Sequence, residues 1–182
     1  MFADNTLTPK ETVRLCALGT LALGATRYSV LANSIRHFIS RITGPSLDVM
    51  GISIELLKYE GLIERSCKSV IEDDAELIIT ERGRIELKAL LTANVRPAAT
   101  EISKLVVALK FRFLHLLDSD ERSIQTDLLI EMTENELARL DDLHQHHANE
   151  GGYLIGWLNH DISLLKKRLS WLEDFKSTIS QS

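Results

Sequence analysis

Side chains that can hydrogen-bond to a phosphate or to the edge of a nucleic-acid base recur between residues 27 and 68. Hydroxyl groups, a phenol and cationic groups all make such contacts in proteins that bind nucleic acids. The residues that we single out are Arg41, Ser46, Ser53, Lys58 and Lys68. Their chemistry is non-covalent binding, so its use depends on the elements that carry these side chains.

A helix, a β-hairpin and a second helix are predicted between Met50 and Leu91. Apolar residues recur at helical spacing up to Gly61, which can take the left-handed conformation that ends a helix. A β-like run at 62–67 and a run rich in β-branched residues at 77–79 predict two strands, and the acidic cluster 72–74 between them predicts a turn.

The residue Thr80 is well placed to begin the second of these helices. Its hydroxyl can accept the free backbone N–H of Gly83, and apolar residues from Ile85 to Leu91 supply the buried side of the helix. A helix, a hairpin and a returning helix form the winged half of a winged-helix domain.

The residues before this stretch predict the rest of a helix-turn-helix. A core helix is expected from Pro9 to Leu23, capped by Thr8, and a second helix over 26–42. Thr43, Gly44 and Pro45 predict the turn, and the recognition helix is expected to begin within 46–53, capped by Ser46 or Ser53. The first residues of a recognition helix enter the major groove of DNA, while preceding elements hold phosphates.

The charge balance is not that of an ordinary nucleic-acid binder. The 182 residues carry a net charge of -5, of which -1 falls in residues 1–92 and -4 in the remainder. The expected recognition helix holds one cation, Lys58, and four carboxylates between Glu72 and Glu76 would repel phosphate. These features favour an alternative in which the domain contacts protein rather than DNA.

The C-terminal half is predicted to be helical. Pro97 marks a linker or a helix start at 95–99, and amphipathic helices are expected over 102–117, 121–150 and 153–179. The last helix repeats apolar residues every three or four positions, a pattern that requires a partner helix. Because a small winged-helix domain cannot cover this apolar surface, we expect a two-fold dimer.

Three segments resemble PadR-like transcription regulators. They are LLKYEGLIER, which contains Leu57 and Gly61, LIITERGRIELKALL, which contains Thr80 and Gly83, and RLSWLEDF near the C-terminus. The resemblance implies a winged-helix protein that binds operator DNA, with a dimer formed by the helical half. Because these proteins carry a tyrosine at the position of Tyr28, the resemblance also adds Tyr28 to the expected DNA-binding residues.

The resemblance also implies a place for a small-molecule effector. In some relatives, paired tryptophans near the dimer axis bind planar aromatic ligands, so Trp157 or Trp171 could do so here. The two lie fourteen residues apart on one expected helix, and aromatic packing in a dimer core is the alternative that we favour on physical grounds.

Other reactive residue types predict no further site. Cys16 and Cys67 lack metal-ligand spacing and are expected to be reduced structural thiols. His144 and His147 share a helical face, but no matching cluster supplies further ligands, so a solvated helix end is favoured over a metal site. No phosphate-binding loop, nucleophile elbow or His-Glu-x-x-His segment is present, so we predict neither an enzyme nor a bound cofactor.

The sequence therefore predicts a mainly α-helical protein with a small β-hairpin wing. We expect a winged helix-turn-helix DNA-binding domain at 1–94 and a helical dimerisation domain at 95–182. The expected function is that of a cytoplasmic, effector-responsive homodimer that binds double-stranded DNA and not a membrane, because no apolar run is long enough to span one. The alternative is a winged-helix dimer that works through protein contacts.

Overall fold

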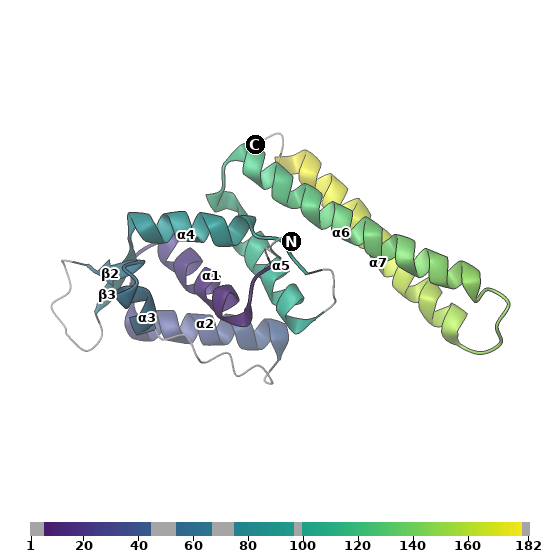
Figure 1. Cartoon of the computed structure of the whole chain (residues 1–182), viewed down its shortest axis with the longest axis horizontal. Coiled ribbons are helices and arrows are strands. Elements are labelled where there is room, and N and C mark those ends of the chain that lie inside the picture. Colours follow the sequence, from purple (N-terminus) through teal and green to yellow (C-terminus); the bar gives the residue numbers. More distant parts are fainter. Residues whose placement is uncertain (1–5, 45–53, 67–74, 97–99, 180–182) are drawn as a thin grey trace, which may run out of the picture. The chain divides into compact units, whose positions relative to one another are not determined.

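The computed structural model describes residues 6–44, 54–66, 75–96 and 100–179. The chain divides into two compact units, Met1–Leu116 and Leu117–Ser182. The described part is mainly helical with one small sheet, as expected from the sequence, and carries a β-hairpin wing (Figure 1). Within it, no helix combines the length and apolar composition needed to cross a lipid bilayer.

Helix α1, Pro9–Ala22, is the core of the first unit. Eight of its fourteen residues are buried, and it packs against helices α2, Tyr28–Thr43, α4, Glu81–Thr92, and α5, Glu101–Phe113. Its start is fixed by a capping box in which the Thr8 hydroxyl accepts the Glu11 N–H and the Glu11 carboxylate accepts the Thr8 N–H. The predicted cap and the central position of this helix are confirmed.

The sheet has three antiparallel strands in the order β1-β3-β2. Strands β2, Ile63–Arg65, and β3, Glu76–Ile79, form the predicted hairpin, and β1, Thr26–Arg27, adds to the free edge of β3. The prediction of one helix over 26–42 is therefore wrong at its start. Arg27 has an extended backbone, and the Tyr28 N–H donates to the Ala75 carbonyl at 3.2 Å. The backbone at this point therefore forms its hydrogen bonds with the wing and not within a helix.

Helix α3, Ile54–Tyr59, is the described part of the expected recognition helix, whose predicted start at 46–53 lies outside the described residues. Gly61 has a φ of 70° and ends the helix as predicted. Its N–H bonds to the Lys58 carbonyl and the Leu62 N–H to the Leu57 carbonyl, both at 2.9 Å, which is the pattern of a Schellman motif. Glu60 is thus the C-cap residue of α3.

The wing and α4 meet at a tight junction. The Thr80 hydroxyl accepts the Gly83 N–H at 3.0 Å, which confirms the predicted cap, and also donates to the Gly61 carbonyl at 2.8 Å. A Cβ added at Gly83 would lie 2.0 Å from the Leu62 carbonyl oxygen. This position therefore requires glycine, and the contact joins the first turn of α4 to the base of the wing.

Helix α5 belongs to the first unit by its packing. Its Arg112 lies over the Phe38 ring of α2, 4.5 Å from the ring centroid, and its Phe113 fills the space above Gly19 of α1. The helix ends at Phe113 and continues as a 3₁₀ turn, Leu114–Leu116. The boundary between the two compact units, after Leu116, thus lies later in the chain than the domain boundary expected between residues 94 and 95. The assignment of DNA binding and dimerisation to the two expected domains remains a prediction.

The second unit is a helical hairpin. Helices α6, Ser119–His146, and α7, Leu154–Ile179, lie side by side along their length (Figure 1). Lys176 near the end of α7 pairs with Asp127 near the start of α6 at 2.5 Å, so the helices are antiparallel. The buried residues of α7 are Leu158, Ile162, Leu165 and Leu172, at intervals of four, three and seven residues, and all four belong to the predicted apolar repeat.

Candidate nucleic-acid interface

The structure brings two of the predicted binding residues together. The Lys58 ammonium of α3 lies 5.7 Å from the centroid of the Tyr28 ring, at the start of α2. A cation over an aromatic face is attracted by the ring quadrupole, so this contact ties the beginning of α2 to α3. Tyr28 is also held to the wing through its backbone bond to Ala75.

The charge of Lys58 is already partly compensated. Its Nζ lies 2.9 Å from the Glu55 carboxylate one turn earlier on α3, and the Glu55 side chain is 62% exposed. The Lys58 side chain itself is 21% exposed, so the pair is partly open to water, where an ion pair contributes little to stability. The pair therefore reduces the positive field of α3 around Lys58.

Arg41 is far from this cluster. It is exposed in the last turn of α2, thirteen residues beyond Tyr28, which at the helical rise corresponds to about 20 Å. One phosphate therefore cannot be held by both residues. The remaining predicted residues, Ser46, Ser53 and Lys68, lie outside the described residues, as does the acidic wing tip 72–74.

The exposed face of α3 is partly apolar. Ile54 and Leu57 are buried within the first unit, whereas Leu56 is 44% exposed and Tyr59 is 90% exposed. The side chains that α3 presents to solvent thus include a carboxylate, a leucine and a tyrosine. Such a face can lie in a groove of DNA or against another protein.

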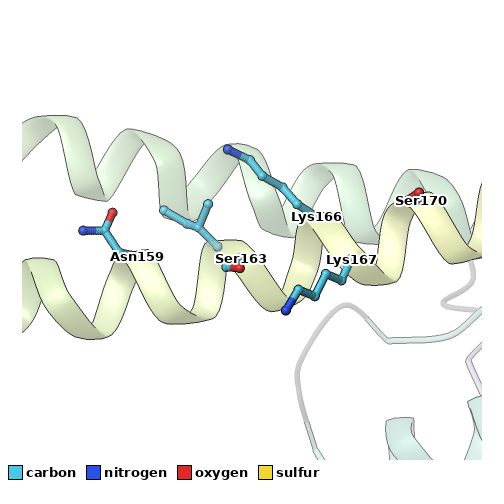
Figure 2. Close-up of a pocket in the computed structure, with 6 residues that line it drawn as sticks. Asn159, Ser163, Lys166, Lys167 and Ser170 are labelled. Carbon is cyan, nitrogen blue, oxygen red and sulfur yellow. The ribbon is translucent and has the colours of Figure 1, made fainter.

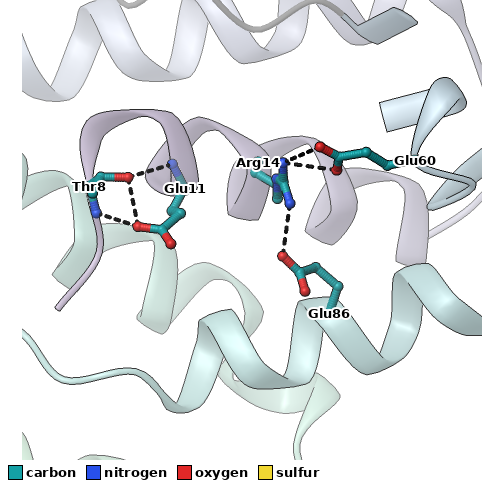
Figure 3. A network of polar contacts seen from close by, with 5 residues as sticks. All are labelled: Thr8, Glu11, Arg14, Glu60 and Glu86. Carbon is teal, nitrogen blue, oxygen red and sulfur yellow. Dashed lines mark hydrogen bonds and ion pairs between the residues drawn. The ribbon is translucent and has the colours of Figure 1, made fainter. Parts of the chain in front are cut away.

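An ion-pair network not predicted from the sequence joins the end of α3 to α1 and α4 (Figure 3). Arg14 of α1 reaches the carboxylates of Glu60, at the end of α3, and of Glu86 in α4. One signal in the sequence could have pointed to it, because Arg14 is the single cation in the apolar run from Val13 to Leu23. A cation in a core helix needs a charged partner.

The outer face of α7 carries a row of large apolar side chains. Trp157, Leu164 and Trp171 follow one another at intervals of seven residues, and they are 53%, 51% and 52% exposed. The Trp171 ring stacks on Phe175 with centroids 5.5 Å apart. This row is distinct from the buried face that packs on α6.

An open hollow of about 470 Å³ lies along another part of α7 (Figure 2). It is lined by Asn159, Ile162, Ser163, Lys166, Lys167 and Ser170. Neither tryptophan lines it, so the hollow is not the predicted aromatic-ligand site. The histidines near the end of α6 form no group of three or more metal-ligand side chains in the part of the chain that the structure describes.

Comparison with known proteins places the chain in a family. A family model described as "Putative AphA-like transcriptional regulator" matches residues 2–176. No curated protein matches the sequence.

Solved structures that resemble the chain include three of PadR from Bacillus subtilis, the kind of regulator that the sequence motifs resemble. The complex with operator DNA is 20% identical, covering 91% of this chain and 98% of that one with a TM-score of 0.36. PadR by itself is 18% identical, covering 97% and 99% with a TM-score of 0.39. The complex with p-coumaric acid is 20% identical, covering 97% and 100% with a TM-score of 0.37. Because the family model spans nearly the whole sequence, the chain belongs to the family of AphA-like transcriptional regulators.

Proposed function

We propose that the protein is a sequence-specific regulator that binds double-stranded DNA as a homodimer in the cytoplasm. The observation that carries the proposal is the exposed face of α3 in a winged helix-turn-helix of a regulator family. The described part of α3 buries Ile54 and Leu57 and turns Glu55, Leu56 and Tyr59 to solvent. A short helix held by one face and exposed on the other is how a recognition helix is presented to the major groove.

In the proposed mechanism, two α3 helices of a dimer enter successive major grooves. Ser46, Ser53 and Lys58 would lie near bases or phosphates, while Tyr28, Arg41 and Lys68 would hold the phosphate backbone. The distance of about 20 Å between Tyr28 and Arg41 supports contacts to separate phosphates along α2. The cation–π contact between Lys58 and Tyr28 supports a shared position beside the wing.

The first test is a fluorescence-anisotropy titration on DNA from upstream of the protein's own gene, with a scrambled competitor, at two salt concentrations. Sequence-preferring binding that weakens steeply with salt is the expected result, because phosphate contacts release counterions. No binding at either salt concentration, by a protein shown to be folded and dimeric, would contradict DNA binding.

A matched pair of substitutions in one turn of α3 sharpens this test. Lys58→Ala is expected to weaken binding to all duplexes by about threefold to tenfold and to reduce the salt slope by about 1, as for loss of one phosphate contact. Glu55→Gln is expected to strengthen binding by a few-fold at low salt, roughly the value of an exposed ion pair, because it frees the Lys58 ammonium. Lys166→Ala on α7 serves as the control, and equal effects of all three changes would exclude a specific role for Lys58.

We also propose that the row Trp157, Leu164 and Trp171 forms part of the dimer interface. Residues at seven-residue intervals stay on one side of a helix that pairs with another helix, and these three are exposed in the single chain. Leu164→Glu places a charge in that interface once per subunit. It is expected to raise the dimer dissociation constant by a factor on the order of 100 or more.

Sedimentation equilibrium of the Leu164→Glu variant measures this effect directly. Ser163→Glu is the matched control, because it adds the same charge at the neighbouring position, on a different face of α7. A dimer that is equally stable in both variants would place the interface elsewhere on the molecule.

The two tryptophans are also the proposed contact for a planar aromatic effector. They are the only tryptophans in the chain, so binding beside them should quench or shift the intrinsic fluorescence. Titration of phenolic acids into the wild type and into Trp157→Leu and Trp171→Leu variants tests this. A quench that survives in both variants would argue against the site.

A protein-contact function is the second candidate. Leu56 and Tyr59 are exposed on α3, and the sequence of the wing is acidic at residues 72–74. Both features would suit a protein partner better than phosphates. The two functions separate by salt dependence, because an apolar protein contact need not weaken as salt rises.

A further inference from the structure

Arg14 joins three helices of the first unit through its guanidinium group (Figure 3). Its Nη2 lies 3.0 Å from Oε1 and 2.9 Å from Oε2 of Glu60, and its Nη1 lies 3.0 Å from Oε1 of Glu86. One nitrogen therefore contacts both carboxylate oxygens of Glu60, while the other is held by α4. The side chains of Arg14, Glu60 and Glu86 are 24%, 30% and 33% exposed, so the contacts are partly shielded from water.

Glu60 stands where a carboxylate is otherwise unfavourable. It is the C-cap of α3, and the C-terminal end of a helix carries a partial negative charge from the aligned peptide dipoles. Without a nearby cation, a carboxylate here would be repelled by the helix end and by Glu86. The positive charge of Arg14 offsets both repulsions, because it lies close to the negative helix end and to both carboxylates.

The described part of α3 has few other anchors. Among its six residues only Ile54 and Leu57 are buried, and its other contacts are the Lys58 ammonium over the Tyr28 ring and the Thr80 hydroxyl on the Gly61 carbonyl just beyond its end. The Arg14 contact lies beyond Leu57, at the cap, and charged groups with several directional contacts fix an angle as well as a distance. Helix α1, which carries Arg14, has eight buried residues and serves as a rigid support.

We propose that Arg14 is a positioning residue for the recognition helix. By holding the C-cap of α3 to α1 and α4, it sets the angle at which α3 leaves the body of the domain, and hence the alignment of its exposed face with a DNA groove. The DNA part of this inference rests on the proposed function. The residue acts through Glu60 and need not touch DNA itself.

The first experiment needs no DNA. Amide hydrogen exchange is measured for the wild type, Arg14→Met, Arg14→Lys and Glu60→Gln, with Arg139→Met on α6 as the matched control. In Arg14→Met, exchange at residues 54–62 is expected to quicken by about tenfold relative to α1, because local opening of weakly anchored segments is separable from global unfolding. Arg14→Lys keeps the positive charge but lacks the guanidinium group whose two nitrogens contact Glu60 and Glu86, so it should show a smaller effect than Arg14→Met. Unchanged exchange at 54–62, or acceleration spread equally over α1 and α4, would overturn the inference.

The second experiment measures discrimination between DNA sequences. A duplex selected by the wild-type protein from a random library is compared with a shuffled duplex of the same composition. Arg14→Met is expected to reduce the ratio of the two affinities by about 3- to 30-fold, the range for residues that act at a distance from a ligand. Affinity for the shuffled duplex should change less than twofold. A loss of folded protein would instead weaken the apparent binding to both duplexes.

Arg14→Lys should recover part of the lost discrimination, and the double variant Arg14→Met/Glu60→Gln should lose no more than Arg14→Met does. A ratio unchanged by Arg14→Met would overturn the DNA part of the inference. If the wild type selects no duplex, the proposed DNA-binding function fails and this DNA part fails with it, whereas the exchange experiment still decides whether Arg14 holds α3.

Discussion

Replacing Gly83 by alanine is expected to lower the free energy of unfolding of the first unit by about 3 kcal/mol or more, which is at the upper end for overpacking. The added Cβ would lie 2.0 Å from the Leu62 carbonyl oxygen and 2.8 Å from the Ile79 side chain. The carbonyl cannot simply retreat, because it accepts the Thr80 N–H at 3.1 Å at the same junction. The clash must therefore separate α4 from the base of the wing or break the cap.

Gly156→Ala is the matched control for this prediction. Gly156 lies within α7 with no atom within 4 Å of an added Cβ, so alanine there should stabilise the helix by up to about 1 kcal/mol. Urea denaturation followed by far-UV circular dichroism measures both variants. Similar midpoints for Gly83→Ala and the wild type would mean that the junction can open at little cost.

Raising the pH from 7 to 10.5 is expected to increase the free energy of unfolding through Lys110, by about 3 kcal/mol over the full range. Lys110 of α5 is 2% exposed and donates to the Leu91 carbonyl of α4 at 2.5 Å. Burial disfavours its charged form and lowers the pKa of Lys110 from 10.5 to about 8. Between these values the unfolded chain binds more protons than the folded one, so stability rises with pH there and is lost as the pH falls toward 8.

The effect is isolated by comparing the wild type with Lys110→Met at several pH values. Cys16 contributes with the opposite sign, because burial raises the pKa of its thiol to about 11, so the folded state loses stability as the pH rises above 9. From pH 7 to 9 the wild type should gain about 1 kcal/mol relative to the variant. Parallel pH profiles in that range would show that the pKa of Lys110 is the same in the folded and unfolded chain.

The sequence by itself determined the local boundaries of the elements. The caps at Thr8 and Thr80 and the left-handed Gly61 involve groups no more than five residues apart, and all three occur as expected. The spacing of apolar residues likewise predicted α1, α4 and α7, because a helix buries one face whatever it packs against. Family resemblance followed from the same motifs.

Only the tertiary structure decided which distant segments meet. Thr26 and Arg27 have the local character of a helix start, yet they form β1 because the open edge of β3 offers hydrogen bonds from fifty residues away. The packing of α5 into the first unit depends on Gly19 leaving room for Phe113, which no local pattern reveals.

The candidate site shows the same division. Sequence motifs picked out Tyr28 and Lys58 separately, and the fold brought them within 5.7 Å of each other while it kept Arg41 at the far end of α2. Arg14 and Glu60 are 46 residues apart, and their contact exists only because the fold brings the end of α3 beside α1. Caps and periodicity depend on neighbouring residues, whereas an ion pair between elements depends on how the whole core packs.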